Sequence, residues 1–328
     1  MDMNKEMNKE MDKIDIVIPV YWDSIACAEW NIPRLYEEFE PQKIVVIGPA
    51  GIEKELPKRE YIEFVEEDSL VPGLCKDAVS SCLDTILSGS SRRAGWYYQQ
   101  FLKLGYALTC KDEYYLIFDM DTTTKGVSFF DSNGKPKFYT SSENHQEYMD
   151  TLSKLIPGVI TKYDSKISFI VNYMLFKTEY VCELLDIIGK SDIRGNCWWE
   201  KILNSIDVSC IKEAGFSEFE TYGNYVMKYH PEVYSIDNAR QYRTIDTFIS
   251  MTPTREQLEW VFKSFESITF EDWNKINYIH VCKLLMKLGL PVTFATTIHD
   301  FISYIIVQSR YHLAKVSKRI NGMFSSHS

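Results

Sequence analysis

The sequence contains no uninterrupted run of about 18 apolar residues, the length that a membrane-spanning helix needs. Its first thirteen residues, MDMNKEMNKEMDK, are polar and include no apolar stretch of the signal-peptide type. We expect residues 1–13 to form a flexible lead that precedes the folded part. We also expect a protein that is neither secreted nor membrane-spanning.

Cysteine spacing of the metal-binding or disulfide type is missing as well. The chain has 8 cysteines, but no CxxC pair and no cluster of cysteine with histidine. This excludes a zinc site of the finger type and argues against a disulfide framework. Free thiols are typical of a reducing compartment, so we expect a cytoplasmic protein.

Positive charge is scarce, with 36 Lys and Arg against 46 Asp and Glu, and the formal net charge is -10. Binding to nucleic acid needs clustered cations that neutralise phosphates, so we expect no nucleic-acid partner. The end of the chain differs, because its only ionised side chains after residue 300 are basic: Arg310, Lys315, Lys318 and Arg319.

Short apolar runs alternate with helical patterns through the first half of the chain. Buried parallel strands are predicted at Ile14–Val20, Lys43–Ile47, Tyr61–Val65 and Tyr114–Phe118. Helices are predicted over Ser24–Phe39, with an interruption at Pro33, and from Gly95 onward. This rhythm predicts a Rossmann-type α/β fold, in which a mixed, mostly parallel sheet is flanked by helices.

The second half is less regular. Strands are predicted at Lys137–Thr140 and Ile167–Met174, and helices at Thr178–Ile188 and Trp198–Ile206. After Pro231 the pattern is mostly helical. We therefore expect a substrate-binding α/β domain over residues 14–235 and a helical C-terminal region over residues 236–328.

The clearest chemical motif is FDMDTTT, which follows the predicted strand Tyr114–Phe118. Open α/β sheets bind their ligands at the carboxyl ends of their strands. Asp119 and Asp121 can converge there on one divalent cation, Mn²⁺ or Mg²⁺. Such an ion bridges the phosphates of a sugar nucleotide and stabilises the charge on the departing diphosphate.

The same residues also match the pattern DxDxT, which resembles the phosphatase motif of the haloacid dehalogenase superfamily. In that family Asp119 would be the nucleophile and Asp121 the acid. The motif normally ends the first strand, whereas here it ends about the fourth, and no DD or GDxxxD sequence follows. This phosphatase is the main alternative to a sugar transferase.

A second motif is GWYYQQFLKLG, in which Gln99, Gln100 and Lys103 lie within one helical turn. A lysine pairs well with diphosphate oxygens, and amides bind sugar hydroxyls. We predict that these three residues belong to the site that binds the sugar nucleotide, the donor of the sugar. A solvated polar helix face would have the same composition.

Five segments carry a family resemblance in their order: GWYYQQFLKL, FDMD, IVNYMLF, WWEKIL and FSEFETYGNY. Together they resemble a bacterial family of uncharacterised proteins that is grouped with GT-A glycosyltransferases and found with polysaccharide biosynthesis. The resemblance covers roughly Lys13 to Pro231, and FSEFETYGNY is its most distinctive stretch. Members often have a histidine where this chain has Tyr173.

The resemblance implies a GT-A fold, a nucleoside-diphosphate sugar donor, UDP- or GDP-linked, and a saccharide or lipid-linked acceptor. The turn after the first strand is then expected to contact the base of the nucleotide, through Pro19, Val20, Tyr21 and Trp22. Acceptor binding is assigned to the residues Asn172, Trp198, Trp199, Glu200 and Tyr222.

Three more side chains have expected roles in the chemistry. Glu218 or Glu220 would take the acceptor proton in an inverting reaction, as a general base does. If the reaction retains configuration, these carboxylates would instead bind the acceptor. His230, in KYHP, is expected as a third metal ligand, although a lone histidine is more often structural.

The segment Ile298–Met323 combines apolar positions with a basic polar face. That pattern fits a helix lying on an anionic membrane, or a helix packed on the domain with a solvated end. We expect peripheral contact with the inner face of the cytoplasmic membrane. A non-catalytic, membrane-associated module is therefore the third alternative.

Overall fold

The computed structural model describes residues 14–89, 93–156, 158, 163–164, 166–238, 240–271 and 278–299. The expected lead over residues 1–13 lies outside these residues, as does the segment Ile298–Met323 except for its first two residues. Among the described residues, no helix has the length and apolar character needed to cross a bilayer.

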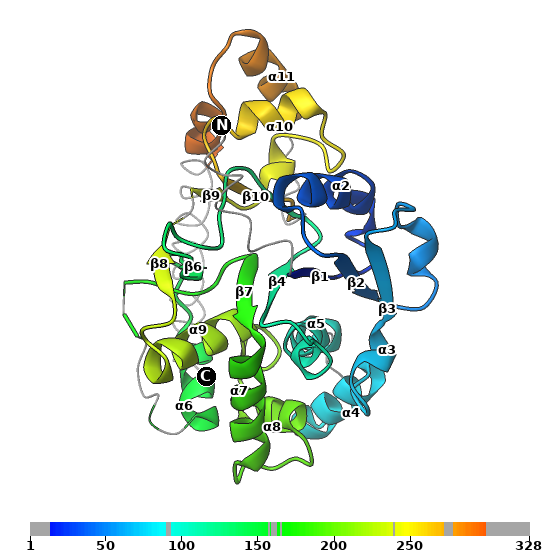
Figure 1. Ribbon diagram of the computed structural model, residues 1–328, viewed down its shortest axis with the longest axis vertical. Helices are drawn as coiled ribbons and strands as arrows, with labels where there is room; N and C mark the ends of the chain where they lie inside the picture. The colour runs from blue at the N-terminus through cyan, green and yellow to red at the C-terminus, as the bar shows by residue number, and fades with distance from the viewer. Residues whose placement is uncertain are drawn as a thin grey trace, which may run out of the picture. The chain divides into compact units, whose positions relative to one another are not determined.

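A five-stranded sheet forms the centre of the fold (Figure 1). Its strand order is β3-β2-β1-β4-β7; the first four strands are parallel, and β7 runs antiparallel to β4. The strands are β1 (Asp15–Pro19), β2 (Ile44–Gly48), β3 (Ile62–Glu66), β4 (Tyr114–Phe118) and β7 (Tyr173–Lys177). Every residue of β1 and β2 is buried, which explains their unbroken apolar sequences.

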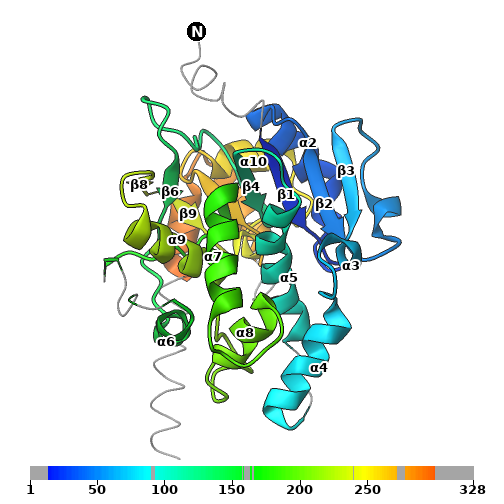
Figure 2. The same ribbon diagram turned by 60° about the horizontal axis from the view of Figure 1, so that its bottom comes forward.

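Helices cover both faces of this sheet (Figures 1 and 2). The chain moves from β1 to β2 in one direction along the sheet and from β3 back to β4 in the other. Because such crossovers are right-handed, the two connections lie on opposite faces. The first contains α2 (Ala28–Phe39), and the second contains α3 (Glu67–Leu70), α4 (Lys76–Leu87) and α5 (Ala94–Gly105).

Three later helices are α7 (Thr178–Lys190), α8 (Trp198–Ser205) and α9 (Glu218–Tyr229). Of these, α9 contacts α5 and α7, and α8 contacts α4 and α7. Another helix, α6 (Gln146–Leu155), contacts α8 and α9. Short 3-10 helices complete the connections: η2 (Ile25–Cys27), η3 (Ile52–Glu55) and η4 (Tyr106–Leu108). The mixed α/β fold with a mostly parallel sheet between helices, as the sequence predicts, is confirmed.

Two small sheets join segments that are distant in the sequence. The first has the order β5-β10-β9, with β5 (Thr122–Thr124), β10 (Ser267–Thr269) and β9 (Gln241–Tyr242). The second pairs β6 (Lys137–Tyr139) with β8 (Ser235–Asp237). Since β5 directly follows Asp121, the first small sheet holds the chain just beyond the FDMD motif.

The chain divides into two compact units. One contains residues up to Tyr242 together with Glu266–Phe270, and the other contains Arg243–Phe265 and the residues from Glu271 onward. The second unit has η5 (Ile245–Thr247), α10 (Arg255–Val261), α11 (Ile279–Lys287) and a helix at 292–299. Within it, Trp260 Nε1 donates to Leu290 O at 2.7 Å. All the described secondary-structure elements of the second unit are helices.

Several predicted elements have different bounds in the structure. The expected strand Ile167–Met174 is replaced by β7, which begins at Tyr173 because Phe118, the last residue of β4, pairs with Tyr173. Pro33 lies inside α2 without interrupting it. The region after Pro231 contains β8, β9 and β10 as well as helices; these strands are too short to show an alternating pattern.

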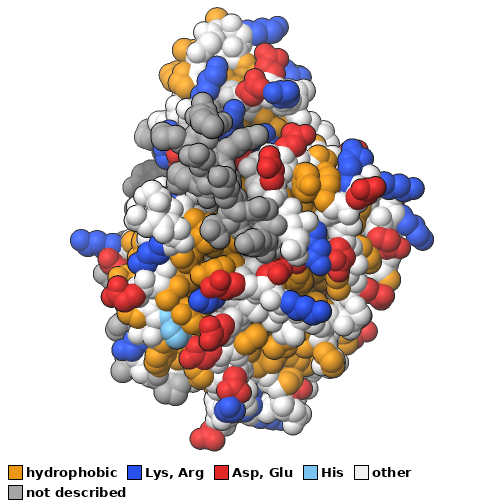
Figure 3. Space-filling model, viewed as in Figure 1, with side chains coloured by type: hydrophobic (Ala, Val, Ile, Leu, Met, Phe, Trp, Pro, Cys, Tyr) orange, Lys and Arg blue, Asp and Glu red, His pale blue; other side chains and the backbone are white. Residues whose placement is uncertain are grey.

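Figure 3 shows the charges on one face of the molecule. On the coloured part of that face, acidic and basic side chains are interspersed, and neither sign gathers in one large field.

Candidate functional site

The strand order fixes where the sheet can bind a ligand. The chain leaves β1 for β2 on one side and later returns to β4 on the other, so the topological switch point lies between β1 and β4. Ligands of open α/β sheets bind outside the carboxyl ends of the strands at this point. Tyr21 follows β1 and Asp119 follows β4, so both flank the switch point.

Lys103, on α5, forms the centre of a buried ion cluster at this edge. Its Nζ lies 2.7 Å from Asp119 Oδ1 and 2.7 Å from Glu218 Oε1, at the start of α9. The ammonium also lies over the ring of Phe219, 4.5 Å from the centroid. The side chains of Lys103 and Glu218 are each 5% exposed, whereas that of Asp119 is 21% exposed. The cluster is therefore open to solvent mainly at Asp119.

The electrostatics of the cluster follow from burial and pairing. Burial by itself lowers the pKa of Lys103, but the attraction of Asp119 and Glu218 outweighs it and raises the pKa above its ordinary value. Burial raises the pKa of Glu218, and Lys103 offsets only part of that rise. Lys103 therefore stays protonated, and its charge is balanced within the protein.

The turn from Asp119 to Thr122 is held in place from three directions. Its own backbone closes the turn, since Thr122 N donates to Asp119 O at 3.0 Å. The buried Asn31 of α2 donates from Nδ2 to Met120 O at 2.9 Å and to Thr122 O at 2.8 Å. Phe270, after β10, donates from its backbone N to Asp121 O at 3.0 Å. Both aspartates are thus fixed through their backbone, while their side chains remain partly exposed.

Asp119 and Asp121 suit an ion that is shared with a substrate. No group of three or more His, Cys, Asp or Glu side chains suited to a metal ion occurs within the described residues. Mg²⁺, however, commonly takes one or two protein carboxylates and completes its shell with water and substrate phosphates. Since Lys103 is already neutralised, a diphosphate approaching the two aspartates needs a cation with it. The pair therefore fits a divalent ion that arrives with a diphosphate.

The turn after β1 lies on the same edge and presents aromatic side chains. Pro19 and Val20 are buried, and Val20 N donates to Ile47 O at 2.8 Å. Tyr21 Oη donates to Gly95 O, at the start of α5, at 3.2 Å. Trp22 is 54% exposed, so its indole face is open to a ligand.

Of the other predicted donor-binding residues, the two glutamines differ in exposure. Gln99 is half-buried, whereas Gln100 is buried, and its Oε1 accepts a hydrogen bond from Glu218 N at 3.1 Å. Gln100 thereby fixes the start of α9 rather than facing a ligand. Lys103 is likewise engaged, because its Nζ pairs with the carboxylates of Asp119 and Glu218.

Both carboxylates expected as a general base are buried in the first turn of α9. Glu218 is bound to Lys103, and Glu220 Oε2 accepts from Ser168 Oγ at 2.8 Å and from Phe169 N at 2.6 Å. Glu218 is 4% exposed and Glu220 is 1% exposed. Because neither reaches the surface, this placement favours a positioning role over proton transfer from an acceptor hydroxyl.

The predicted acceptor-binding residues do not assemble at one place. The backbone O of Asn172 accepts from Asp119 N at 3.1 Å, so this residue lies at the site. Trp198 and Trp199 are 9% and 4% exposed and pack against Phe101, so neither offers a ring face to a sugar. Glu200, on the same helix, accepts from Asn196 N at 2.6 Å.

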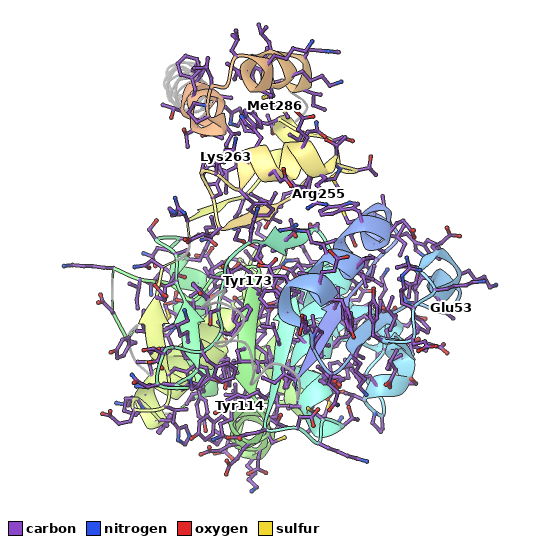
Figure 4. The ribbon with its side chains drawn as sticks, turned by 45° about the horizontal axis from the view of Figure 1, so that its top comes forward. Glu53, Tyr114, Tyr173, Arg255, Lys263 and Met286 are labelled. Carbon is purple, nitrogen blue, oxygen red and sulfur yellow. The ribbon has the colours of Figure 1, made fainter. Side chains whose placement is uncertain are left out.

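Tyr222 and His230 lie at the opposite edge of the sheet. Tyr222 Oη accepts from Lys177 N, at the far end of β7, at 2.9 Å. His230 stacks on Tyr180 and its Nε2 lies 2.9 Å from Glu183 Oε2. Figure 4 labels Tyr114 and Tyr173, at the two ends of the β4–β7 ladder; Asp119 lies beyond the Tyr173 end and Tyr180 beyond the Tyr114 end. The structure therefore does not bring His230 to the aspartates.

Sequence reasoning missed three residues at this edge. Asn31 holds the FDMD turn; Glu67 and Asp68 follow β3, and Asp68 Oδ1 accepts from Tyr98 Oη at 2.8 Å. The signal for Glu67 and Asp68 was present, because they lie two and three residues after the predicted strand Tyr61–Val65. No pattern in the sequence marks Asn31, since it lies in the middle of an ordinary amphipathic helix.

No family model matches the sequence, and no curated protein matches it. Similar solved structures include mouse xyloside xylosyltransferase 1 in its apo form, with 13% identity and a TM-score of 0.39, covering 80% of this chain and 98% of that one. An active-site mutant of LgtC is 11% identical, with a TM-score of 0.38, and covers 84% of this chain and 95% of that one. Galactosyltransferase LgtC in complex with donor and acceptor sugar analogs has the same identity and coverage, with a TM-score of 0.39.

Proposed function

We propose that the chain is a glycosyltransferase of the GT-A type, which moves a sugar from a nucleoside-diphosphate sugar to a saccharide or lipid-linked acceptor. The observation that carries this proposal is the Lys103 cluster. A buried ammonium holds the partly exposed Asp119 in place beside the switch point of the sheet, where Asp121 follows two residues later. Buried charge pairs of this kind cluster at functional sites.

The donor is then oriented by charge. Asp119 and Asp121 hold Mg²⁺ or Mn²⁺, and the ion, when bound, stabilises the negative charge of the departing diphosphate. Lys103 and Glu218 keep the Asp119 carboxylate at one position. Tyr21 and the exposed Trp22 lie beyond the end of β1 and are proposed to contact the base.

In the reaction, the bond between the anomeric carbon and the diphosphate oxygen breaks and a bond to the acceptor oxygen forms. The electron pair of the broken bond leaves with the diphosphate, and an oxygen of that diphosphate takes the proton that the acceptor hydroxyl loses, directly or through water. Glu218 and Glu220 are proposed as positioning residues, since both are buried and hydrogen-bonded. Asn172, next to Asp119, is the residue proposed to contact the acceptor.

The wider setting belongs to the same proposal. The family that the sequence resembles occurs with polysaccharide biosynthesis in bacteria, so we propose a role in building a surface polysaccharide. All 8 cysteines are free, which suits a reducing cytoplasm. Contact with the inner face of the cytoplasmic membrane through the basic C-terminal segment is proposed from its sequence alone.

Thermal unfolding with nucleoside diphosphates tests this function. We expect UDP or GDP at 100 times its dissociation constant to raise the melting temperature by about 4 °C, and only with Mn²⁺ or Mg²⁺ present. Asp121→Asn should abolish the shift without disturbing the Lys103 ion pairs. Asp186→Asn is the matched control, because Asp186 is exposed on α7 and pairs only with Lys190 among the described ion pairs.

The alternatives give different results in the same experiments. A phosphatase of the dehalogenase type would hydrolyse an aryl phosphate, and Asp119→Asn would stop that reaction. A membrane-associated module would show neither nucleotide binding nor hydrolysis, yet would sediment with anionic vesicles. Either outcome, without a cation-dependent nucleotide shift, would overturn the proposed function.

A further inference from the structure

Glu67 is a buried carboxyl group at the ligand-binding edge that the proposed function has not used. It is the first residue of α3 and directly follows β3. Because β1 to β4 are parallel, it lies on the same edge as Tyr21 and Asp119. Three strand spacings, about 14 Å, separate β3 from β4. That span is comparable to the reach of an extended nucleoside diphosphate.

One oxygen of this carboxyl group, Oε2, lacks a hydrogen-bond donor among the described residues. Glu67 is 7% exposed, and no described residue donates a hydrogen bond to its buried Oε2 atom. A buried acceptor without a donor is costly, and native proteins rarely keep one without a functional reason. An unpaired acceptor on a residue at a ligand-binding edge is therefore a sign of a ligand that supplies the hydrogen-bond donor.

The neighbouring hydroxyl groups are engaged elsewhere. Tyr21 and Tyr98 are both close enough to Glu67 to interact with its charge. Tyr21 Oη donates to Gly95 O at 3.2 Å, and Tyr98 Oη donates to Asp68 Oδ1 at 2.8 Å. Each hydroxyl has one proton to donate, so neither tyrosine has another for Glu67. The surrounding residues thus leave this acceptor open.

The charge around Glu67 determines which part of a donor can bind there. Glu66 and Asp68 are adjacent acids, and they outnumber the single nearby cation, Lys76. A phosphate is repelled by such a group, whereas neutral hydroxyl or N–H donors are attracted. Burial, with help from Asp68, raises the pKa of Glu67 to about 7. A ligand that donates hydrogen bonds to the carboxylate would stabilise its ionised form.

We infer that Glu67 binds the nucleoside part of the sugar donor, by accepting hydrogen bonds from its ribose hydroxyls or from an N–H group of its base. This inference rests on the proposed function. It also sets the direction of the donor along the sheet edge: the nucleoside lies toward β3, and the diphosphate lies toward Asp119 and Asp121, where a cation accompanies it.

Isothermal titration of the full chain with UDP and with GDP, in the presence of Mg²⁺, tests the inference. Glu67→Gln should weaken binding at pH 7.5 by about tenfold, which corresponds to replacing hydrogen bonds to a charged carboxylate by bonds to a neutral amide. Glu66→Gln is the matched control, because Glu66 is the adjacent residue and is exposed; we expect its affinity to stay within twofold of the wild type.

Proton linkage gives a second readout. Binding should favour ionised Glu67, so between pH 6 and 8 the affinity of the wild type should rise more steeply than that of Glu67→Gln. If a ribose hydroxyl donates the hydrogen bond to Glu67, a 2′-deoxynucleoside diphosphate should bind the wild type less tightly than the ribonucleotide does. A difference between UDP and GDP that Glu67→Gln removes would instead identify the base.

The outcomes separate the two proposals. If the wild type binds a nucleoside diphosphate with Mg²⁺ and Glu67→Gln binds it equally well, the role of Glu67 is wrong and the proposed function stands. If the wild type binds no nucleoside diphosphate, the proposed function fails and the inference fails with it. Thermal unfolding of each variant without ligand confirms that it is folded.

Discussion

Lys103 Nζ lies 2.7 Å from Glu218 Oε1, although 115 residues separate them in the sequence. The contact joins α5 to the start of α9, and the same ammonium holds Asp119 at the end of β4. One buried cation thus connects two helices to the loop on which the proposed chemistry depends. Its removal should affect both the stability of the fold and the position of Asp119.

Replacing Lys103 by methionine should lower the free energy of unfolding by about 3–5 kcal/mol, because it leaves Asp119 and the buried Glu218 without their cation. Chemical denaturation at pH 7 measures this loss. Adding Glu218→Gln should recover part of it. The exposed pair on α7 is the control: Lys190→Met should change stability by less than about 0.5 kcal/mol. An equally small effect of Lys103→Met would contradict the central role of the cluster.

Glu67 should make stability depend on pH. Its pKa in the folded protein is about 7, above the ordinary value of 4.5. Between pH 4.5 and 7, Glu67 is therefore protonated in a larger fraction of folded molecules than of unfolded ones. Stability from this group is therefore complete below pH 4.5 and is lost as pH rises through 7. Glu67→Gln should be more stable than the wild type at pH 8, by about 1–2 kcal/mol after allowance for screening by water and Lys76.

The difference between these two proteins should vanish near pH 4. Melting temperatures across this range, with Glu66→Gln in parallel, measure it. A wild type that is more stable than Glu67→Gln at pH 8 would show that Glu67 is stabilised in its ionised form without a ligand.

Asn31 should position the two aspartates. Asn31→Ala removes the donor to Met120 O and Thr122 O and leaves both carbonyls in a buried turn, so we expect a loss of about 2–3 kcal/mol. We also expect weaker binding of the cation together with a nucleoside diphosphate, while the ligand-binding residues themselves are unchanged. Asn204→Ala is the control, since its Nδ2 donates to a carbonyl within α8, remote from the FDMD turn. Equal effects of the two variants on binding would argue against this role.

His230 should be dispensable for metal binding. It stacks on Tyr180 and contacts Glu183, at the edge of the sheet away from Asp119. We expect His230→Gln to leave the Mn²⁺ concentration needed for nucleotide binding within twofold of the wild type. Asp121→Asn should raise that concentration by at least tenfold. A large effect of His230→Gln would show that α9 rearranges when the ion binds.

Most of the central sheet could be predicted from the sequence because β1, β2 and β4 are almost entirely buried. The run Tyr114–Phe118 is apolar throughout, and its bounds in the structure are those that were predicted. The start of β7 could not be predicted in this way. The apolar run begins well before Tyr173, and only pairing with β4 determines which of its residues join the sheet.

The site was predictable only where it follows a strand. Asp119 and Asp121 end an obvious strand, so their place at the ligand-binding edge follows from the pattern. The contacts of Lys103 with Glu218 and of Asn31 with Met120 join segments that are distant in the sequence, and no local pattern indicates them. Aromatic residues were also ambiguous: Trp198 and Trp199 have the composition of a sugar-binding surface but are buried against Phe101.

Anomalous scattering from Mn²⁺ in crystals grown with a nucleoside diphosphate would show whether the two aspartates bind the ion together with the diphosphate. We expect one manganese peak within coordination distance of Asp119 or Asp121, with the diphosphate on its other side and Lys103 still paired to Asp119. Nucleotide bound elsewhere on the protein, or manganese away from both aspartates, would contradict the proposed function.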